Sequence, residues 1–224
     1  MVRQSARSAE YEAALAVLAG QGLIYSCSCS RGDLPGSGSA EARYPGYCRA
    51  GPRRPAASLA LRLRTDGVPP ITITDRVQPP FTQAVDAVVG DFVLKRRDGF
   101  YAYQLAVVVD DAAQGISHVV RGLDLYDNTP RQRLLQQALG LPAVDYLHLP
   151  LVVDAAGGKL SKSRQALAAD PGRAPEVLSQ VLGWLSHPPP AALQKAPAAE
   201  QLSWAVDHWN PMKLQGITEV VAPD

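Results

Sequence analysis

Three cysteines stand close together in one irregular stretch of the sequence. Cys27 and Cys29 are separated by one residue, and Cys48 follows Tyr44 by four positions. Thiolates bind zinc tightly, and a structural zinc site needs four ligands. The spacing alone leaves two interpretations open, a zinc site with a further ligand or three free thiols. An odd number of cysteines with one tight pair favours a reducing cytosol and metal chemistry over disulfide bonds.

A second candidate group is RGLD at 121–124, which comes directly after the apolar run 117–120. If that run is a strand of a parallel sheet, the loop lies at its carboxyl end, where open α/β sheets bind ligands. An arginine at such a place can hold a carboxylate with two parallel hydrogen bonds. The alternative is that Arg121 pairs with Asp124 for a structural purpose, and the residues alone leave both open.

A lysine-containing loop follows a later apolar run, 146–153. It reads KLSKS at 159–163 and comes after two glycines. Glycines permit a mobile loop, and Lys159 and Lys162 can neutralise charge that develops on a triphosphate. The alternative is that the loop has no ligand, because loops of lysine and serine are common and usually just face solvent.

Tyr103 lies in an apolar segment, where an aromatic residue is usually part of the core with its hydroxyl on a partner. Two basic clusters can meet a nucleic acid, although solvated loop charges explain them equally well. The clusters are Arg49, Arg53 and Arg54, and Lys95, Arg96 and Arg97. With 22 basic and 21 acidic residues the net charge is +1, which neither indicates nor excludes such a partner.

The predicted secondary structure around these groups changes along the chain from a helix to an irregular stretch and then to strands. Residues 8–21 repeat apolar side chains at helical spacing, with Ser8 as a cap. Stretch 26–58 is irregular, and a bound metal would explain so long a stretch without regular structure. Strands are predicted by alternation and by flanking prolines or glycines at 59–63, 71–75 and 91–95.

From residue 100 onward the pattern alternates between helix and strand, which is typical of a parallel α/β sheet. A final segment from about residue 174 predicts a helical tail around the prolines at 188–190. The predicted elements are a buried helix at 100–113, a short buried strand at 117–120, a helix at 129–139 capped by Thr129, and a strand at 146–153.

Composition agrees with a soluble globular protein of one large or two small domains, since 46% of its 224 residues are apolar. The longest apolar run is far shorter than the roughly 20 residues that a membrane span needs. The first twenty residues carry charges throughout and lack the apolar core of a signal peptide.

Taken together and in order, these motifs resemble the glutamyl-tRNA synthetase-like family of class I aminoacyl-tRNA synthetases. KLSKS at 159–163 resembles the KMSKS loop, and YQLAVVVDDAAQGISHVVRGLDLYDNTPRQ at 103–132 resembles the corresponding core. Leu160 replaces the usual methionine, a volume-conserving change. The tail after Ser163 has 61 residues (224 − 163), too few for the anticodon-binding region of a true glutamyl-tRNA synthetase. This short tail resembles the glutamyl-queuosine tRNA(Asp) synthetase branch.

The resemblance implies an α/β fold with a Rossmann-like parallel sheet, a small β-rich zinc-containing insertion and a short helical tail. The expected parts are a helix of the catalytic domain, the zinc-binding insertion, the second half of the catalytic domain and the tail. Their ranges are 1–22, 23–99, 100–165 and 166–224.

The same resemblance implies that glutamate is activated with ATP and Mg²⁺ without tRNA, then transferred to the queuosine wobble base of tRNA(Asp). Tyr103 and Arg121 match glutamate-contacting residues, and Lys162 matches the catalytic ATP-binding lysine, with Lys159 beside it. A monomeric cytoplasmic protein with no membrane partner is expected. One structural Zn²⁺ is implied, with the ligands Cys27, Cys29, Tyr44 and Cys48.

Family members begin with a strand and a HIGH-type motif that cradle ATP, and this sequence contains neither. The expectation from the sequence is therefore that the amino-terminal part is missing and that the chain alone forms no glutamyl-adenylate. Two alternatives stay open, a non-catalytic zinc-containing fragment that binds tRNA or another partner, and a truncated true glutamyl-tRNA synthetase, which the short tail disfavours.

Overall fold

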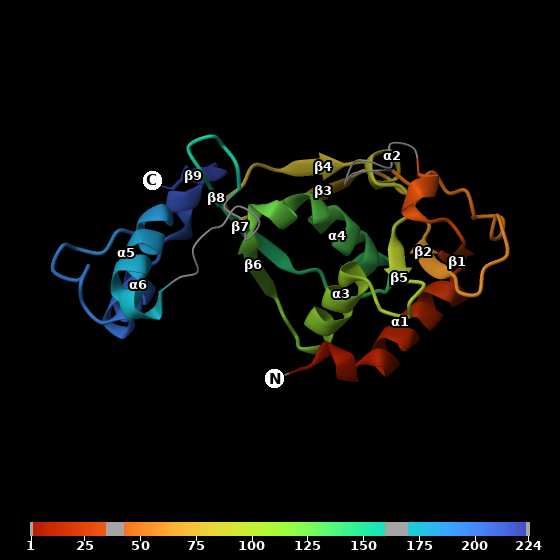
Figure 1. The fold of residues 1–224 in the computed structure, drawn as a ribbon, viewed down its shortest axis with the longest axis horizontal. Coiled ribbons are helices and arrows are strands. Elements are labelled where there is room, and N and C mark those ends of the chain that lie inside the picture. Colours follow the sequence, from red (N-terminus) through yellow and green to blue (C-terminus); the bar gives the residue numbers. More distant parts are fainter. Residues whose placement is uncertain (1, 35–42, 160–169, 223–224) are drawn as a thin grey trace. The chain divides into compact units, whose positions relative to one another are not determined.

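The chain forms two compact units that interleave along the sequence. The structure, a computed structural model, describes residues 2–34, 43–159 and 170–222 (Figure 1). Unit 1 comprises Met1–Ile73, Phe81–Ser117 and Asp127–Val144, and unit 2 comprises Thr74–Pro80, His118–Tyr126 and Asp145–Asp224. Each unit therefore draws on segments that are far apart in the sequence. The four-part division predicted from the sequence stays a prediction.

Unit 1 contains two small antiparallel sheets. In the first, Ala60–Leu63 (β2) lies between Ile24–Cys27 (β1) and Val93–Lys95 (β5). In the second, Ile71–Ile73 (β3) pairs with Phe81–Gln83 (β4), and a short helix, Val85–Val88 (α2), follows. The predicted strands are confirmed as β2, β3 and β5. The sequence does not predict β1 and β4, because β1 runs into the cysteine-containing stretch without regular periodicity and β4 directly follows Pro79 and Pro80.

Three longer helices of unit 1 lie against one another in the order α1, α3, α4. Their bounds are Ser8–Gly20 (α1), Tyr103–Ala113 (α3) and Thr129–Ala138 (α4). Tyr11, Leu15 and Leu18 recur at helical spacing and form the buried face of α1. Tyr11 donates its hydroxyl hydrogen to Asp110 Oδ2 at 2.8 Å, which ties α1 to α3. The predicted helix at 8–21 is therefore confirmed, but the prediction that Ser8 caps it is wrong, because Ser8 is its first residue and the N-cap position falls on Arg7.

Helix α3 begins three residues later than the sequence predicts. Ala102 is extended, with φ −74° and ψ 149°, and Tyr101 forms an antiparallel bridge with Lys95 of β5. This pairing occupies the residues that would otherwise begin the helix. Phe100 is 68% exposed, so the prediction of a buried helix over the whole of 100–113 is wrong at its start.

The start of α4 also differs from the prediction. A 3-10 helix, Leu123–Asn128 (η3), runs directly into α4, so Thr129 lies inside the helix rather than before it. The N-cap position falls on Asn128, whose backbone is already helical and whose side chain makes no capping hydrogen bond. The prediction that Thr129 caps the helix is therefore wrong, although the helix itself is confirmed.

Unit 2 contains two pairs of parallel strands. His118–Gly122 (β6) pairs with Asp145–Leu149 (β7), and Leu151–Val153 (β8) pairs with Glu219–Val221 (β9). Pro150 lies between β7 and β8, so the predicted strand at 146–153 is two strands. The parallel pairing confirms the predicted α/β class.

Strand β6 is less buried than its apolar sequence predicts. Val120 is 61% exposed and His118 is exposed, so the expectation of a buried strand at 117–120 is wrong. Within the described residues the sheet of β6 and β7 has two strands, which leaves part of its surface uncovered.

The last part of unit 2 is helical, as predicted. Helices Ala174–Trp184 (α5) and Ala198–His208 (α6) contact each other. Short 3-10 helices complete the described elements at Gln4–Ala6 (η1), Arg31–Asp33 (η2), Pro171–Arg173 (η5) and Pro211–Leu214 (η6). No helix in the described part of the chain has the length and apolar character that crossing a membrane requires.

Candidate functional site

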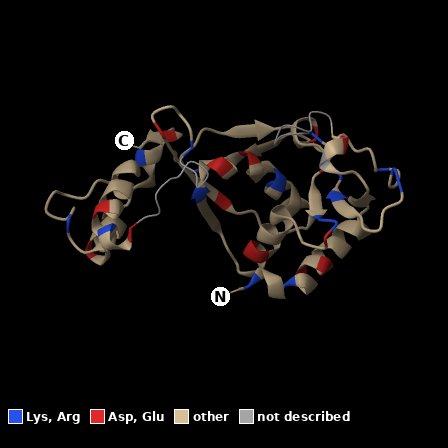
Figure 2. Cartoon of the chain, in the orientation of Figure 1, with Lys and Arg blue, Asp and Glu red and all other residues tan. Residues whose placement is uncertain are grey.

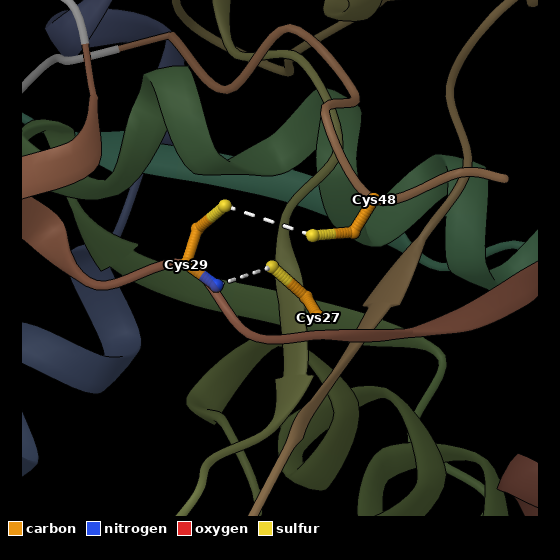
Figure 3. A group of neighbouring side chains, drawn as sticks. All are labelled: Cys27, Cys29 and Cys48. Atoms are coloured by element: carbon orange, nitrogen blue, oxygen red, sulfur yellow. Dashed lines mark hydrogen bonds between the residues drawn. The ribbon is translucent and has the colours of Figure 1, made fainter. Parts of the chain in front are cut away.

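Three cysteine side chains converge in the interior of unit 1 (Figure 3). The sulfur atoms of Cys27, Cys29 and Cys48 all lie within 4.8 Å of one another, and the three side chains are buried. Cys29 Sγ and Cys48 Sγ are 3.6 Å apart, far beyond the S–S bond of about 2.05 Å in a disulfide. A buried cluster of thiols of this kind can hold a metal ion.

The phenol of Tyr44 lies against the same three thiols. Its oxygen is 3.2 Å from Cys27 Sγ and 3.6 Å from Cys29 Sγ, and the backbone N–H of Cys48 donates to it at 3.0 Å. In a tetrahedral zinc site, bonds of about 2.3 Å to sulfur and 2.0 Å to oxygen place neighbouring ligand atoms about 3.5–3.8 Å apart. Separations of 3.2 and 3.6 Å are close to these values, and the three sulfur atoms all lie within 4.8 Å of one another, so small shifts would place the four side chains around one zinc ion.

A glycine fixes the backbone that presents Tyr44. The N–H of Tyr44 donates to Val89 O at 3.1 Å, and Tyr44 O accepts from the N–H of Asp91 at 3.2 Å. Gly90, between these two partners, has φ +70°, and a Cβ at this position would lie 2.0 Å from Tyr44 O. Glycine is therefore required both by the left-handed backbone and by the close approach.

Burial and hydrogen bonds affect the ligands differently. Burial raises the pKa of the Cys29 thiol. Burial also raises the pKa of Cys48, but hydrogen bonds from Tyr44 and from backbone N–H groups outweigh it and lower this pKa to about 6. Burial is likewise the main reason why the pKa of the Tyr44 phenol lies far above its usual value. Cys48 is thus able to form the metal-binding thiolate near neutral pH.

A second polar group lies in unit 2, near the carboxyl ends of β6 and β7. The parallel register sets Arg121 beside His148. Arg121 Nε donates to His148 Nε2 at 3.0 Å, and a terminal nitrogen of Arg121 donates to Leu125 O at 3.3 Å. His148 Nδ1 lies 2.7 Å from Asp75 Oδ2, and both side chains are fully buried. The guanidinium of Arg121 is therefore held through His148 by a buried carboxylate.

These contacts assign the hydrogen on the His148 ring. A guanidinium only donates, so Nε2 is the acceptor, and Nδ1 carries the hydrogen and donates it to Asp75. Asp75 Oδ1 also accepts the backbone N–H groups of Val77 and Gln78, both at 2.9 Å. Burial raises the pKa of Asp75, but the hydrogen bonds from His148, Val77 and Gln78 outweigh it and hold the pKa below its usual value. Asp75 is therefore ionised at neutral pH.

Lys159, Lys162 and Tyr103 are the other residues predicted to bind substrate. Lys159 Nζ is 2.7 Å from Asp124 Oδ2, but both side chains are more than one third exposed, so the pair adds little stability. Lys162 lies outside the described residues. Tyr103 begins α3 in unit 1 and is 47% exposed, so the interpretation of Tyr103 as a core aromatic is wrong.

The two basic clusters of the sequence are mostly neutralised by ion pairs within unit 1. Figure 2 shows basic and acidic residues interspersed along the ribbon. Four of the six cations have a carboxylate partner, so the clusters offer a nucleic acid fewer unpaired charges than the sequence indicates. The pairs are Arg49 with Asp91, Arg54 with Asp33, Lys95 with Glu12, and Arg96 with Asp98.

Sequence reasoning missed His148, which contacts Arg121, Asp75, which contacts His148, and Arg62, which contacts Cys27 and Tyr44. Asp75 ends a predicted strand and His148 interrupts the apolar run YLHLPLVV, where a polar residue in a buried strand could have served as a signal. Arg62 occupies the polar place in the alternating run LALRL, which predicts exposure, yet it is only 8% exposed.

Comparison with known proteins relates this chain to tRNA synthetases. Residues 1–182 match the family described as tRNA synthetases class I (E and Q), catalytic domain. The chain is 48% identical over 216 residues to the glutamyl-Q tRNA(Asp) synthetase of Ectopseudomonas mendocina (strain ymp), across 96% of this chain and 71% of that protein. It is 47% identical to the protein of that name from Thiobacillus denitrificans (strain ATCC 25259 / T1), across 92% of this chain and 69% of that protein.

A solved structure has a similar fold. The chain superposes on the glutamate-tRNA synthetase of Elizabethkingia anophelis with a TM-score of 0.73 and 19% sequence identity. The match covers 97% of this chain and 52% of that one, so this chain spans about half the length of the solved synthetase.

Proposed function

This chain belongs to the glutamyl-Q tRNA(Asp) synthetases of the class I (E and Q) tRNA synthetase family, and we propose that it serves their ligase reaction. In this reaction ATP activates glutamate without tRNA, and the glutamate passes to the queuosine wobble base of tRNA(Asp). The observation that best supports the assignment is the convergence of Cys27, Cys29, Tyr44 and Cys48, which fits the zinc site implied for that branch.

In the proposed site Arg121 binds a carboxylate of glutamate. Its guanidinium can present two parallel N–H groups to a carboxylate, which a lysine cannot do. His148 and Asp75 fix the plane of the guanidinium from one side, and the Tyr146 ring lies beneath it with its centroid 5.2 Å from Cζ. Such support lowers the cost of orienting Arg121 when glutamate binds. We assign Tyr103 a further contact to glutamate.

We assign the lysines Lys159 and Lys162 to ATP. Charge builds on the phosphates, and on the pyrophosphate that leaves, as the glutamate carboxylate attacks the α-phosphorus of ATP. A cation that meets this charge stabilises the transition state more than the ground state. Lys162 takes this catalytic role, and Lys159 supplies further positive charge. Mg²⁺ bound with ATP would share the same task.

The proposed zinc ion has a structural role. All four positions of a tetrahedral site are taken by Cys27, Cys29, Tyr44 and Cys48, so none remains for a substrate or a water molecule. The ion would hold the segment between β1 and β2 by joining its start, at Cys27 and Cys29, to Tyr44 and Cys48 further along. We propose that the protein works as a cytosolic monomer.

The activation step is tested by exchange of labelled pyrophosphate into ATP, measured with the natural gene product that contains this chain. We expect exchange that requires glutamate and proceeds without tRNA. A protein that binds tRNA and zinc but shows no such exchange would contradict the enzymatic assignment. Exchange that starts only when tRNA(Glu) is added would favour a true glutamyl-tRNA synthetase instead.

A further inference from the structure

Arg62 of β2 is a buried cation, 8% exposed. No carboxylate of the described residues lies within ion-pair distance of its guanidinium. Nε donates to Cys27 Sγ at 3.2 Å, and a terminal nitrogen donates to the backbone oxygen of Asp91 at 2.7 Å. Its Cζ lies 3.8 Å from the centroid of the Tyr44 ring. Two of the four prospective zinc ligands are therefore the main side-chain neighbours of this charge.

Burying a guanidinium without a counter-charge is costly, so a buried arginine is normally paired with an anion. A backbone oxygen and an aromatic face offset only part of that cost. Among the described side chains that Arg62 contacts, the thiol of Cys27 is the one whose ionisation would place a negative charge within hydrogen-bond distance of the guanidinium.

The charge balance of metal binding supplies that anion. Zn²⁺ binds thiolates, so three thiols release three protons to solvent when the ion enters. The centre then carries a net charge of −1 (+2 − 3) with a neutral phenol, and −2 if the oxygen of Tyr44 binds as a phenolate. A cation placed within hydrogen-bond distance of one ligand sulfur stabilises this negative centre relative to the neutral thiols.

We propose that Arg62 is the counter-cation of the metal centre and a positioning residue for two of its ligands, Cys27 and Tyr44. The proposal rests on the proposed zinc site. The N–H of Arg62 directs the sulfur of Cys27, and the guanidinium plane restricts the Tyr44 ring. Arg62 touches neither the metal nor a substrate, so its effect is expected in metal affinity.

The test measures the affinity of the purified chain for Zn²⁺ by competition with a chromophoric chelator. Substitutions of outer partners of metal ligands typically weaken binding about 10–100-fold, and we expect a loss of this size for Arg62→Gln. Arg62→Lys keeps the charge but loses the planar guanidinium that contacts Cys27, Asp91 O and the Tyr44 ring, so its zinc affinity should lie between those of Arg62→Gln and the unchanged protein. Arg64→Gln is the matched control, since Arg64 lies two residues away and pairs with Asp66 at the surface. It should leave zinc affinity unchanged.

Thermal unfolding with and without Zn²⁺ separates this role from a merely structural one. A ligand that binds the folded protein stabilises it by an amount set by its affinity. We expect Arg62→Gln to reduce the increase in Tm that Zn²⁺ produces. An equal loss of Tm in both states, with unchanged zinc affinity, would overturn the proposal.

The outcomes also distinguish this proposal from the zinc site on which it rests. If the unsubstituted chain binds no Zn²⁺, the zinc site itself is refuted. If the unsubstituted chain binds Zn²⁺ and Arg62→Gln binds it equally well, the role of Arg62 alone is refuted. If Arg62→Gln does not fold, Arg62→Lys decides, because a zinc affinity equal to that of the unsubstituted protein would contradict the positioning of Cys27 and Tyr44 by the guanidinium.

Discussion

His148 Nδ1 lies 2.7 Å from Asp75 Oδ2, and neither side chain is exposed. The other ring nitrogen of His148 accepts a hydrogen bond from Arg121. Asp75 thus determines which nitrogen of His148 carries the hydrogen. It thereby determines whether the Nε2 atom that faces Arg121 accepts a hydrogen bond or is itself a donor.

Asp75→Asn should impair glutamate use although it changes no residue in contact with the substrate. An asparagine can donate to Nδ1, which moves the ring hydrogen to Nε2, where it opposes the donor of Arg121. Losing a hydrogen bond to a charged group costs about 1.5–3 kcal/mol, so we expect kcat/KM for glutamate to fall about 10–150-fold, mainly through KM. Steady-state exchange kinetics measure this. Asp145→Asn is the control, because Asp145 faces His118 in an exposed pair. Equal effects of the two changes would contradict the role of Asp75.

Arg121→Lys tests the forked contact directly. The positive charge is kept, but a lysine cannot make two parallel hydrogen bonds to one carboxylate. We expect a rise in KM for glutamate of at least about tenfold, as for one lost charged hydrogen bond, while KM for ATP stays unchanged. An unchanged KM and turnover for glutamate would refute the assignment.

Gly90→Ala should lower zinc occupancy. The added Cβ would lie 2.0 Å from Tyr44 O, which forces the backbone that carries this ligand to move. Gly99→Ala is the matched control, since Gly99 also has a left-handed backbone (φ +86°) but no atom near its Cβ position. Both variants carry the backbone cost of about 1–2 kcal/mol, whereas only Gly90→Ala should lose zinc in elemental analysis. Full zinc content in Gly90→Ala would contradict the role of Tyr44.

Asp91→Asn should destabilise unit 1. The fully buried carboxylate of Asp91 accepts hydrogen bonds from Arg49 at 2.7 Å, Tyr25 at 2.5 Å and the backbone N–H of Thr65 at 2.8 Å. Removing one partner of a buried ion pair typically costs about 3–5 kcal/mol. The free energy of unfolding, measured with denaturant, should fall by an amount of this order.

The same variant predicts a pH dependence. Burial raises the pKa of Asp91, but the hydrogen bonds from Arg49, Tyr25 and Thr65 outweigh it and place the pKa below its usual value. A lowered folded-state pKa means that the ionised carboxylate stabilises the fold above the unfolded pKa of about 3.9, and that this contribution is lost as pH falls through the folded pKa. The stability difference between the protein and Asp91→Asn should therefore be constant above about pH 4 and shrink below it. A difference that grows as the pH falls would contradict this sign.

The sequence predicts the regular elements well where their period is long enough to detect. Helix α1 follows from Tyr11, Leu15 and Leu18 at helical spacing, and β2 follows from the alternation in LALRL. The burial of β6 is predicted wrongly, because an apolar sequence reports what a strand can bury and not what covers it, and Val120 is exposed.

Of the candidate sites, the sequence predicts the residues that carry a motif but not the residues that support them. The residue type and spacing of Cys27, Cys29 and Cys48 are enough to predict a candidate metal site. Asp75 and His148 are 73 positions apart in the chain and meet only because a bridge at Asp75 joins the start of β7. No local pattern encodes a contact of that range.

The most direct test of the proposed function identifies the tRNA that receives the glutamate. Labelled glutamate, ATP and the natural gene product containing this chain are incubated with tRNA(Asp) that carries queuosine, and in parallel with tRNA(Asp) that carries guanosine at the wobble position. We expect label only on the queuosine-containing tRNA, and in its anticodon fragment after nuclease cleavage. Label on both forms of tRNA(Asp), or at the 3′ end of tRNA(Glu), would contradict the proposed function.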